Sequence, residues 1–212
     1  MFYRPEEGHG LPHNPFKAIV APRPIGWISS VDEKGRVNLA PYSFFNAISD
    51  APPMVMFSSQ GVKGGGERKD SLANIRATGE FVVNIVSREL SDKMNLSSGA
   101  YEAGVDEFEI AGLTKAPSVT VTPPRVAEAP AALECRLWRV IDLPGENNAM
   151  VIGIVTGVHI DERHLKDGLL DVTSYQPLAR LGYFDYAAVE EVFSLRRPDR
   201  PGGGGDRGRK GG

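Results

Sequence analysis

Residues 25–43 read IGWISSVDEKGRVNLAPYS and contain a complete strand, turn and strand. Residues 25–31 are a short apolar run, which predicts a buried strand. Residues 32–35 (DEKG) are typical of a tight turn, and residues 36–43 predict a second strand. We therefore expect these two strands to pair as an antiparallel hairpin.

Similar short apolar runs follow along the chain and predict a mainly β protein. Further strands are expected at residues 54–58, 80–86, 132–141 and 149–160. In the last of these, Gly153 and Gly157 are expected to mark bulges or tight bends, because glycine lets two backbones approach closely.

Helices are few in this pattern. One is expected over residues 70–78, with Asp70 as its N-cap and Gly79 as its stop. A second is expected over residues 87–95. No helix alternates regularly with the strands, which argues against a doubly wound parallel sheet. We expect an antiparallel β-barrel with a few short helices.

The composition is that of a globular protein, with 41% hydrophobic and 24% charged residues. No apolar run approaches the ~18 residues that a membrane-spanning helix needs. The first residues, MFYRPEEGHG, lack the pattern of a secretory signal. The single cysteine, Cys135, permits no internal disulfide. These features predict a cytoplasmic protein.

The charge is distributed unevenly along the chain. Residues 196–212 contain six Arg or Lys and two Asp, a charge of +4; since the whole chain carries −3, the remaining residues carry −7. This Gly- and Pro-rich basic tail has no apolar side chain to bury, so we expect it to be disordered and residues 1–195 to form one domain. The tail either keeps the protein soluble or contacts RNA or an acidic partner; the acidic body makes nucleic acid an unlikely main partner.

Residues 57–75 (FSSQGVKGGGERKDSLANI) join a strand end, a glycine-rich loop and a helix start. The stretch lacks the spacing of a Walker A loop and of a dinucleotide-binding fingerprint. Its hydroxyls and cations still suit a phosphate, because a helix N-terminus attracts anions. The candidate contacts are Ser58, Ser59, Arg68, Lys69 and Ser71. The alternative is an ordinary surface loop.

Residues 38–49 (NLAPYSFFNAIS) begin as a strand and then lose its regularity. Pro41 cannot donate to a strand ladder and belongs at an edge or bulge. Backbone amides beside Ser43 and Asn46 suit a flat heteroaromatic ligand with several acceptors on its rim. The alternative is an ordinary strand and turn in which Phe44 and Phe45 are buried.

Six segments, taken together, resemble the flavin reductase-like, FMN-binding split-barrel family. They are APRPIGWISSVDEKGRVNLAPYSFFNAISDAPPMVMFSS, KDSLANIRATGEFVVNIVS, DEFEIAGLT, ALECRL, IGIVTGVHI and PLARLGYFDY, in order within residues 14–190. The family includes flavoredoxin-type proteins and the reductase components of two-component flavin monooxygenases. The resemblance implies a homodimeric, antiparallel Greek-key split barrel that binds FMN, or less often FAD, near the subunit interface.

Matched residue by residue, the resemblance implies two parts of a flavin site. The ring site falls on Ala40, Pro41, Tyr42, Ser43, Phe44, Phe45 and Asn46. The phosphate and ribityl site falls on Ser58, Ser59, Arg68, Lys69, Asp70 and Ser71. The insert VKGGGE leaves open which cation reaches the phosphate. Arg180 and Tyr183 resemble a C-terminal contribution, from this chain or its partner, and Arg23 and Trp27 could approach the ribityl chain or ring edge.

The resemblance implies an oxidoreductase, and two functions remain open. The first is an NAD(P)H-dependent flavin reductase, with NADH or NADPH as co-substrate, which would feed a monooxygenase partner. The second is a non-catalytic FMN-binding electron carrier without a pyridine-nucleotide site. Hydride chemistry belongs to the cofactors, so no catalytic residue is predicted. The sequence accordingly lacks a Gly-x-Ser-x-Gly elbow and a His-Glu-x-x-His motif.

The remaining reactive side chains are interpreted as structural or exposed. The four histidines are assigned to the surface, because no further ligands for a metal can be placed. Cys135 is expected to be a small core side chain. The acidic run of Asp106, Glu107 and Glu109 is expected to be a solvated loop.

Overall fold

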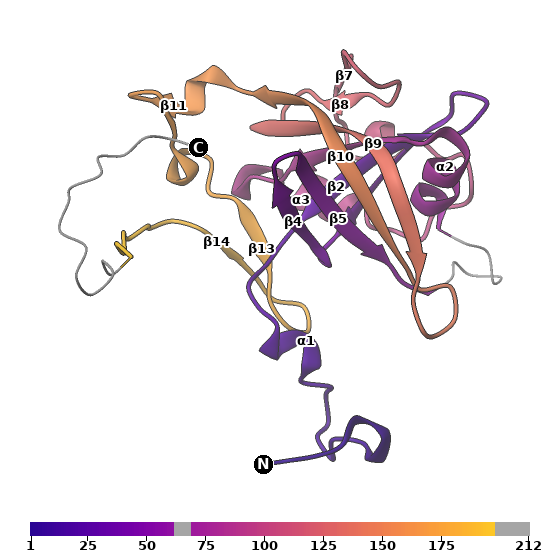
Figure 1. Cartoon of the computed structure of the whole chain (residues 1–212), viewed down its shortest axis with the longest axis vertical. Helices are drawn as coiled ribbons and strands as arrows, with labels where there is room; N and C mark the ends of the chain where they lie inside the picture. The colour runs from indigo at the N-terminus through magenta and orange to yellow at the C-terminus, as the bar shows by residue number, and fades with distance from the viewer. Residues whose placement is uncertain (62–68, 198–212) are drawn as a thin grey trace.

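The computed structural model describes residues 1–61 and 69–197, and its centre is a seven-stranded antiparallel sheet. The strand order is β3-β2-β6-β9-β10-β5-β4 (Figure 1). The bounds are β2 Gly26–Val31, β3 Val37–Tyr42, β4 Phe45–Asp50, β5 Pro53–Ser59, β6 Glu80–Ile85, β9 Ala131–Asp142 and β10 Ala149–Ile160. The expected mainly β, antiparallel architecture is confirmed.

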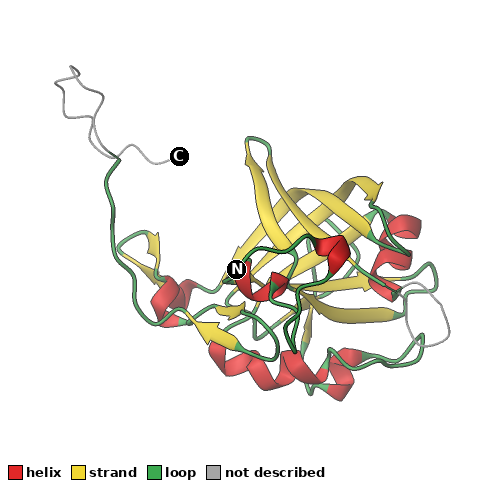
Figure 2. Cartoon of the chain, turned by 90° about the horizontal axis from the view of Figure 1, so that it is seen from below, coloured by secondary structure: helices red, strands yellow, loops and turns green. Residues whose placement is uncertain are grey.

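Smaller elements surround this sheet (Figure 2). The short strands are β1 Arg23–Pro24, β7 Lys115–Ala116, β8 Arg125–Val126, β11 Leu165–Lys166, β12 Leu169–Leu170, β13 Leu178–Arg180 and β14 Tyr186–Ala188. The α-helices are α1 Phe16–Ile19, α2 Asp70–Thr78, α3 Ser91–Leu96 and α4 Glu107–Ile110. The 3₁₀ helices are η1 Pro5–Glu7, η2 Arg88–Leu90, η3 Glu162–His164 and η4 Val172–Ser174. None of the described helices is long and apolar enough to cross a membrane.

The hairpin predicted from residues 25–43 is present. β2 pairs with β3 in register from Gly26 opposite Tyr42 to Val31 opposite Val37. The Asp32 carboxylate accepts hydrogen bonds from the backbone amides of Lys34 and Arg36, at 2.9 and 2.8 Å. A short acidic side chain at the start of the turn therefore fixes the local geometry that sets the register.

The predicted glycine positions in β10 coincide with irregular pairing. The register against β9 shifts between Ile152 and Gly153, and again between Val155 and Gly157. A Cβ atom at Gly153 would lie inside van der Waals distance of the Phe81 ring. Glycine is needed here because the Phe81 side chain of β6 packs directly against the β10 backbone at this position.

Two hydrophobic clusters stabilise the sheet. The first lies inside the curled sheet and includes Ile28, Phe57, Phe81 and Cys135. The second lies under α3 and α4 and includes Trp27. Neighbouring residues of β2 enter different clusters because side chains alternate along a strand. Cys135 is the small buried side chain that we expected, and burial raises the pKa of its thiol.

Strand β4 was not predicted from the sequence. Of its residues, only Phe45 is buried, and Asn46, Ala47 and Ile48 are exposed. It pairs with β5 and has a register shift between Ala47 and Ser49. A strand at the end of the sheet buries too little to leave a clear alternating pattern, so its sequence resembles a loop.

The helix starts differ in detail from the prediction. Lys69, not Asp70, is the N-cap of α2; it has extended backbone angles, and its carbonyl accepts bonds from the Leu72 and Ala73 amides. Asp70 is the first helical residue, where its charge complements the helix dipole. Gly79 ends the helix with a left-handed φ of 74°, as expected. The helix expected over 87–95 is instead η2 followed by α3.

The solvated-loop prediction for the acidic run is wrong for Glu107. This residue is 5% exposed, and its Oε2 accepts a hydrogen bond of 2.9 Å from the Leu39 amide. β3 ends the sheet order, so its outer amides need partners. Asp106 caps α4 by accepting from the Phe108 amide at 3.0 Å. Glu107 therefore joins α4 to β3, and Asp106 stabilises the start of the helix.

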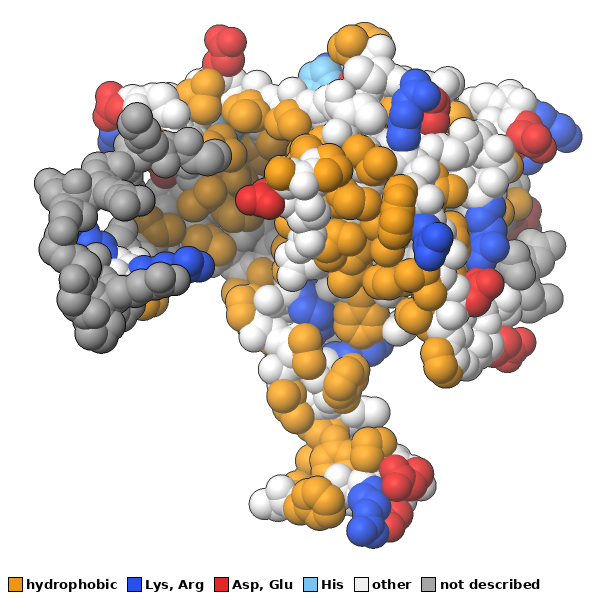
Figure 3. Space-filling model, in the orientation of Figure 1, with side chains coloured by type: hydrophobic (Ala, Val, Ile, Leu, Met, Phe, Trp, Pro, Cys, Tyr) orange, Lys and Arg blue, Asp and Glu red, His pale blue; other side chains and the backbone are white. Residues whose placement is uncertain are grey.

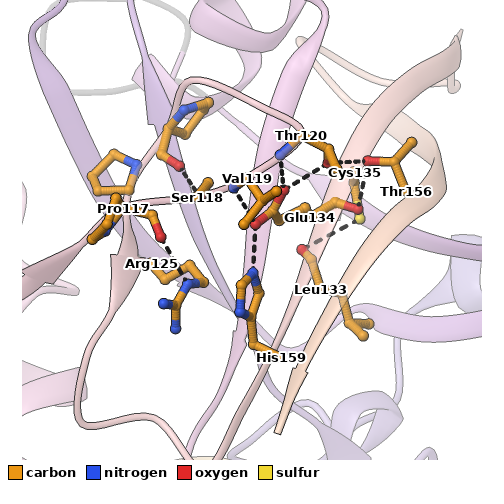
Figure 4. Close-up of polar contacts among 12 residues, drawn as sticks. Pro117, Ser118, Val119, Thr120, Arg125, Leu133, Glu134, Cys135, Thr156 and His159 are labelled. Carbon is orange, nitrogen blue, oxygen red and sulfur yellow. Dashed lines mark hydrogen bonds and ion pairs between the residues drawn. The ribbon is translucent and has the colours of Figure 1, made fainter.

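The surface assignment holds only in part for His159, whose side chain is 25% exposed. Its Nε2 lies 2.5 Å from Oε1 of Glu134, a fully buried carboxylate on β9 (Figure 4). Glu134 also accepts bonds from the Val119 amide and from the amide and hydroxyl of Thr120. Burial alone would raise the pKa of the Glu134 carboxyl, but these hydrogen bonds lower it to about 2. Glu134 thus fastens the loop at residues 117–124 to the sheet.

The N-terminal segment with α1 and the β13–β14 hairpin lie on the same side of the sheet, next to each other (Figure 1). β1 pairs with β13, which places Arg23 opposite Arg180. Ala18 of α1 packs against Gly182 so closely that a Cβ atom there would collide with it. The N-terminal segment and the β13–β14 hairpin therefore form one structural unit beside the sheet.

Candidate functional site

A pocket of about 890 Å³, here called the main pocket, lies between the chain ends and the sheet. Its walls come from the N-terminal segment 12–17, the corner after β3, the end of α3 and the β13–β14 hairpin. Its size is in the range of small-molecule and cofactor sites. None of the described residues that line it is acidic. It therefore suits an anionic ligand with a planar apolar part.

Arg23 and Arg180 both line the main pocket, and they lie directly opposite each other in the β1–β13 pair. Burial, and then the charge of Arg180, lower the pKa of Arg23. Like charges at opposite cross-strand positions destabilise a sheet. An anion bound between the chain ends would remove this cost.

The Arg23 guanidinium is largely occupied by the protein itself. Its two terminal nitrogens donate to the carbonyls of Lys17, Val20 and Leu181. Arg23 therefore ties α1 and the C-terminal hairpin to β1, and only its Nε lacks a partner among the described residues. Its main role is to shape the pocket wall. Trp27 is fully buried, with its Nε1 bonded to Ser97 Oγ at 2.8 Å, so the expectation that it reaches a flavin is wrong.

A second group of predicted residues gathers at the start of α2. Burial raises the pKa of Tyr42 to about 12, an effect that the nearby hydroxyls of Ser71 and Ser59 partly offset. Among the described residues, Tyr42 Oη and Ser59 Oγ nevertheless have no partner with hydrogen-bond geometry, although both atoms are buried. Buried hydroxyls without partners are costly. They fit a site that is completed by an acceptor-rich ligand.

Lys69 supplies a cation beside these hydroxyls. Its Nζ lies over the Tyr42 ring, 5.6 Å from the centroid. Burial, and then the charge of Lys17, lower the pKa of Lys69. Lys17 lines the main pocket, so a pocket-lining cation acts on Lys69. Two cations, buried hydroxyls and the first-turn amides of α2 have the chemistry of a phosphate site.

The other predicted residues occupy varied positions. Pro41, Ser43, Arg180 and Tyr183 line the main pocket. Ser58 and Ser59 are adjacent on β5 and so face opposite sides, of which only the Ser59 side is buried. The rest are Ala40, half-buried against the core; Phe44, beneath the Arg23 guanidinium; Phe45, in the core; and Asn46, exposed. Asp70 is half-buried at the helix start, and Arg68 lies outside the described residues.

Several lining residues were not singled out in the sequence. Lys17, with His13 and Phe16, comes from a segment before the first strand, and Asn95 and Ser98 come from the end of α3. Phe184 and Tyr186 also line the pocket, and the sequence did signal them, because both lie in the segment PLARLGYFDY that carries the family resemblance. The other residues reach the pocket through tertiary packing alone.

The comparison with known proteins decides the family. Residues 20–179 match the flavin reductase like domain. This protein belongs to the flavin reductase-like family. The match covers the whole seven-stranded sheet, the pocket-lining Arg23 and the start of α2, and it ends one residue before Arg180. The resemblance noted from the sequence is confirmed.

Three solved structures are similar to this flavin reductase-like chain. Nitrilotriacetate monooxygenase component B from Bacillus cereus is 32% identical, with a TM-score of 0.83 over 92% of this chain and 98% of the other. The 2-nitrobenzoate 2-nitroreductase of Pseudomonas fluorescens is 31% identical, with a TM-score of 0.76 over 86% and 88%. Flavoredoxin of Desulfovibrio vulgaris is 25% identical, with a TM-score of 0.71 over 83% and 91%. Together they support an oxidoreductase of the flavin-binding type.

Proposed function

We propose that this protein binds FMN and catalyses hydride transfer from NADH or NADPH to the flavin. The observation that carries the proposal is an acid-free pocket of about 890 Å³ together with the start of α2, where Lys69 lies over Tyr42 beside buried hydroxyls and is affected by the charge of the pocket-lining Lys17. Family membership and the similarity to a monooxygenase component support it. FAD is a less favoured ligand.

The two groups of residues would hold opposite ends of FMN. Lys69, with Ser71, Ser59 and the Tyr42 hydroxyl, would bind the phosphate, and Lys17 would add a second positive charge. Pro41, Ser43 and Tyr183 would line the ring end.

Position and electrostatics are what the chain itself contributes to the reaction. When bound, the flavin would accept a hydride from C4 of the reduced nicotinamide, which is left as the oxidised cation. Arg180 would place positive charge at the pocket, where it stabilises added negative charge. The packed chain ends would keep water from this side of the pocket. We also propose that reduced flavin passes to a monooxygenase partner, which the similarity to a monooxygenase component supports.

A second copy of this chain is the partner that the surface favours. On the outward face of β5 and β10, Met54, Met56 and Ile154 are partly exposed, Ile152 is buried, and Ile48 of the neighbouring β4 is 49% exposed. Figure 3 shows a broad hydrophobic surface over the front of the molecule, where Figure 1 draws β10, β5 and β4. Large exposed apolar patches mark interaction sites. We propose that this face is the interface of a homodimer.

The first test is the visible spectrum of the purified protein after addition of FMN, then with NADH or NADPH under anaerobic conditions. We expect bound-flavin bands that bleach with a reduced nicotinamide. Bands that bleach only with dithionite would replace the reductase by the electron carrier, an alternative that the similarity to flavoredoxin supports. Failure to take up FMN would overturn both.

A further inference from the structure

We propose that a second pocket beside the main pocket binds the phosphate-bearing part of a nicotinamide dinucleotide, with Arg88 as its anion contact. The inference rests on the proposed function and deepens it by locating the co-substrate. It assigns a role to a residue that the sequence pattern does not mark.

The side pocket, as we call it, has a volume of about 500 Å³. It adjoins the main pocket, because five residues line both: Met94, Asn95, Arg180, Phe184 and Tyr186. A ligand in the side pocket can therefore extend into the main pocket without crossing a wall. Direct contact between two bound molecules is what hydride transfer requires.

The charge of the side pocket favours phosphate. Arg88 and Arg180 both line it, and among the described residues neither side chain pairs with a carboxylate. Arg88 is held by a bond of 2.7 Å from its Nη1 to Ser91 Oγ, and Arg180 donates to Tyr186 Oη and the Tyr183 carbonyl. A guanidinium group whose hydrogen-bond partners are neutral carries a positive charge that no carboxylate compensates. It can therefore pair with a phosphate, which it binds in a fixed geometry.

Asp92 is the acidic residue that lines the side pocket in the described part of the chain. With Arg88 and Arg180 it leaves a net charge of +1 at the pocket. Asp92 would repel a phosphate, so its removal should strengthen binding while the removal of Arg88 weakens it. This opposite pair of effects separates an electrostatic role from a structural one.

Phe184 offers a flat surface at the junction of the two pockets. It is 91% exposed, at the tip of the hairpin between β13 and β14. The preceding Tyr183 has a φ of 54°, a left-handed conformation that costs energy for a bulky residue. A strained turn that holds an aromatic ring in solvent suits stacking against a nicotinamide or adenine ring.

The volume and the paired cations favour a dinucleotide over a small aromatic carboxylate. A benzoate-sized molecule has a single negative charge and would leave most of about 500 Å³ unfilled. A dinucleotide supplies two linked phosphates and a second ring.

The experiment compares two hydride donors with FMN-loaded protein. NADPH and NADH carry phosphates, whereas 1-benzyl-1,4-dihydronicotinamide carries the same reacting ring without any. For each variant we would measure the ratio of the KM for the dinucleotide to the KM for the benzyl compound. Arg88→Ala should raise this ratio about tenfold, because a charge-assisted contact to phosphate is lost. Arg88→Lys should recover part of it.

Two further variants complete the test. Asp92→Asn should lower the ratio, and Arg163→Ala, which removes an arginine side chain that is 82% exposed, is the matched control and should leave it unchanged. An unchanged ratio in Arg88→Ala, an equal rise in both KM values, or a higher ratio in Asp92→Asn would overturn the proposal.

The wild-type protein separates this proposal from the proposed function. Reduction by the benzyl compound but not by NADH or NADPH would overturn the dinucleotide site and leave a flavin that accepts hydride. Reduction by none of the three donors would overturn the reductase function itself.

Discussion

At the scale of single residues, Lys69 gives the sharpest test of the phosphate site. Its ammonium group lies over the Tyr42 ring and is affected by the charge of Lys17, and neither of these groups can form an ion pair with it. Lys69→Ala should weaken FMN binding about tenfold, because a charge-assisted hydrogen bond contributes ~1.5–3 kcal/mol. Riboflavin binding should hardly change, since riboflavin has no phosphate. Fluorescence titration with both flavins measures the two affinities.

The control for Lys69 is Lys93→Ala. Lys93 donates to the Gly112 carbonyl outside the main pocket, so this variant should bind both flavins as the wild type does. If Lys69→Ala weakened riboflavin and FMN equally, Lys69 would shape the pocket and not bind phosphate.

At the residue scale, Glu134 also gives the protein a definite pH dependence. Its pKa is about 2 in the folded protein and ~4.3 in an unfolded chain, so its stabilisation is complete above that higher value. It is lost as the pH falls toward 2. Glu134→Gln should lower the free energy of unfolding at pH 7 by about 2 kcal/mol. The difference from the wild type should shrink between pH 5 and pH 2, as measured by urea unfolding at a series of pH values.

The conservative control for Glu134 is Glu128→Gln, since Glu128 accepts from the Thr114 amide on the exposed surface. Its effect on stability should be small. A Glu134→Gln penalty that stayed constant down to pH 2 would contradict the low pKa.

At the scale of elements, the packing of the Phe81 side chain of β6 against the backbone of β10 depends on Gly153. Gly153→Ala would place a methyl group against the Phe81 ring, so we expect a loss of about 1–3 kcal/mol of stability in urea unfolding. Combining it with Phe81→Leu should cost less than the sum of the single changes, because the smaller side chain leaves room. Strictly additive losses would mean that Phe81 is not what the methyl group meets.

At the scale of the whole molecule, the apolar face of β5 and β10 predicts the oligomeric state. Wild-type protein should sediment as a dimer, and Met56→Lys should shift it to a monomer at micromolar concentration, because a charge in an apolar interface is poorly solvated. Analytical ultracentrifugation measures both. Ile110→Lys changes an exposed apolar side chain on α4 and should leave the dimer intact. A monomeric wild type would overturn the proposed interface.

The sequence by itself determined the antiparallel β architecture, the hairpin of residues 25–43, the bulges at Gly153 and Gly157 and the end of α2 at Gly79. These features follow from turn chemistry and from the period of apolar residues, both of which act over a few neighbours. The resemblance, too, pointed to Pro41, Ser43 and Arg180 in the pocket wall.

Only the tertiary structure decided how distant segments meet. It brought Lys17 near Lys69, directed most of the Arg23 guanidinium to backbone carbonyls, and buried Glu107 and Glu134 among amides. A charged side chain is exposed in most contexts, and nothing local marks one that will be buried with partners. The partners come from segments far apart along the chain, so their meeting depends on the packing of the whole fold.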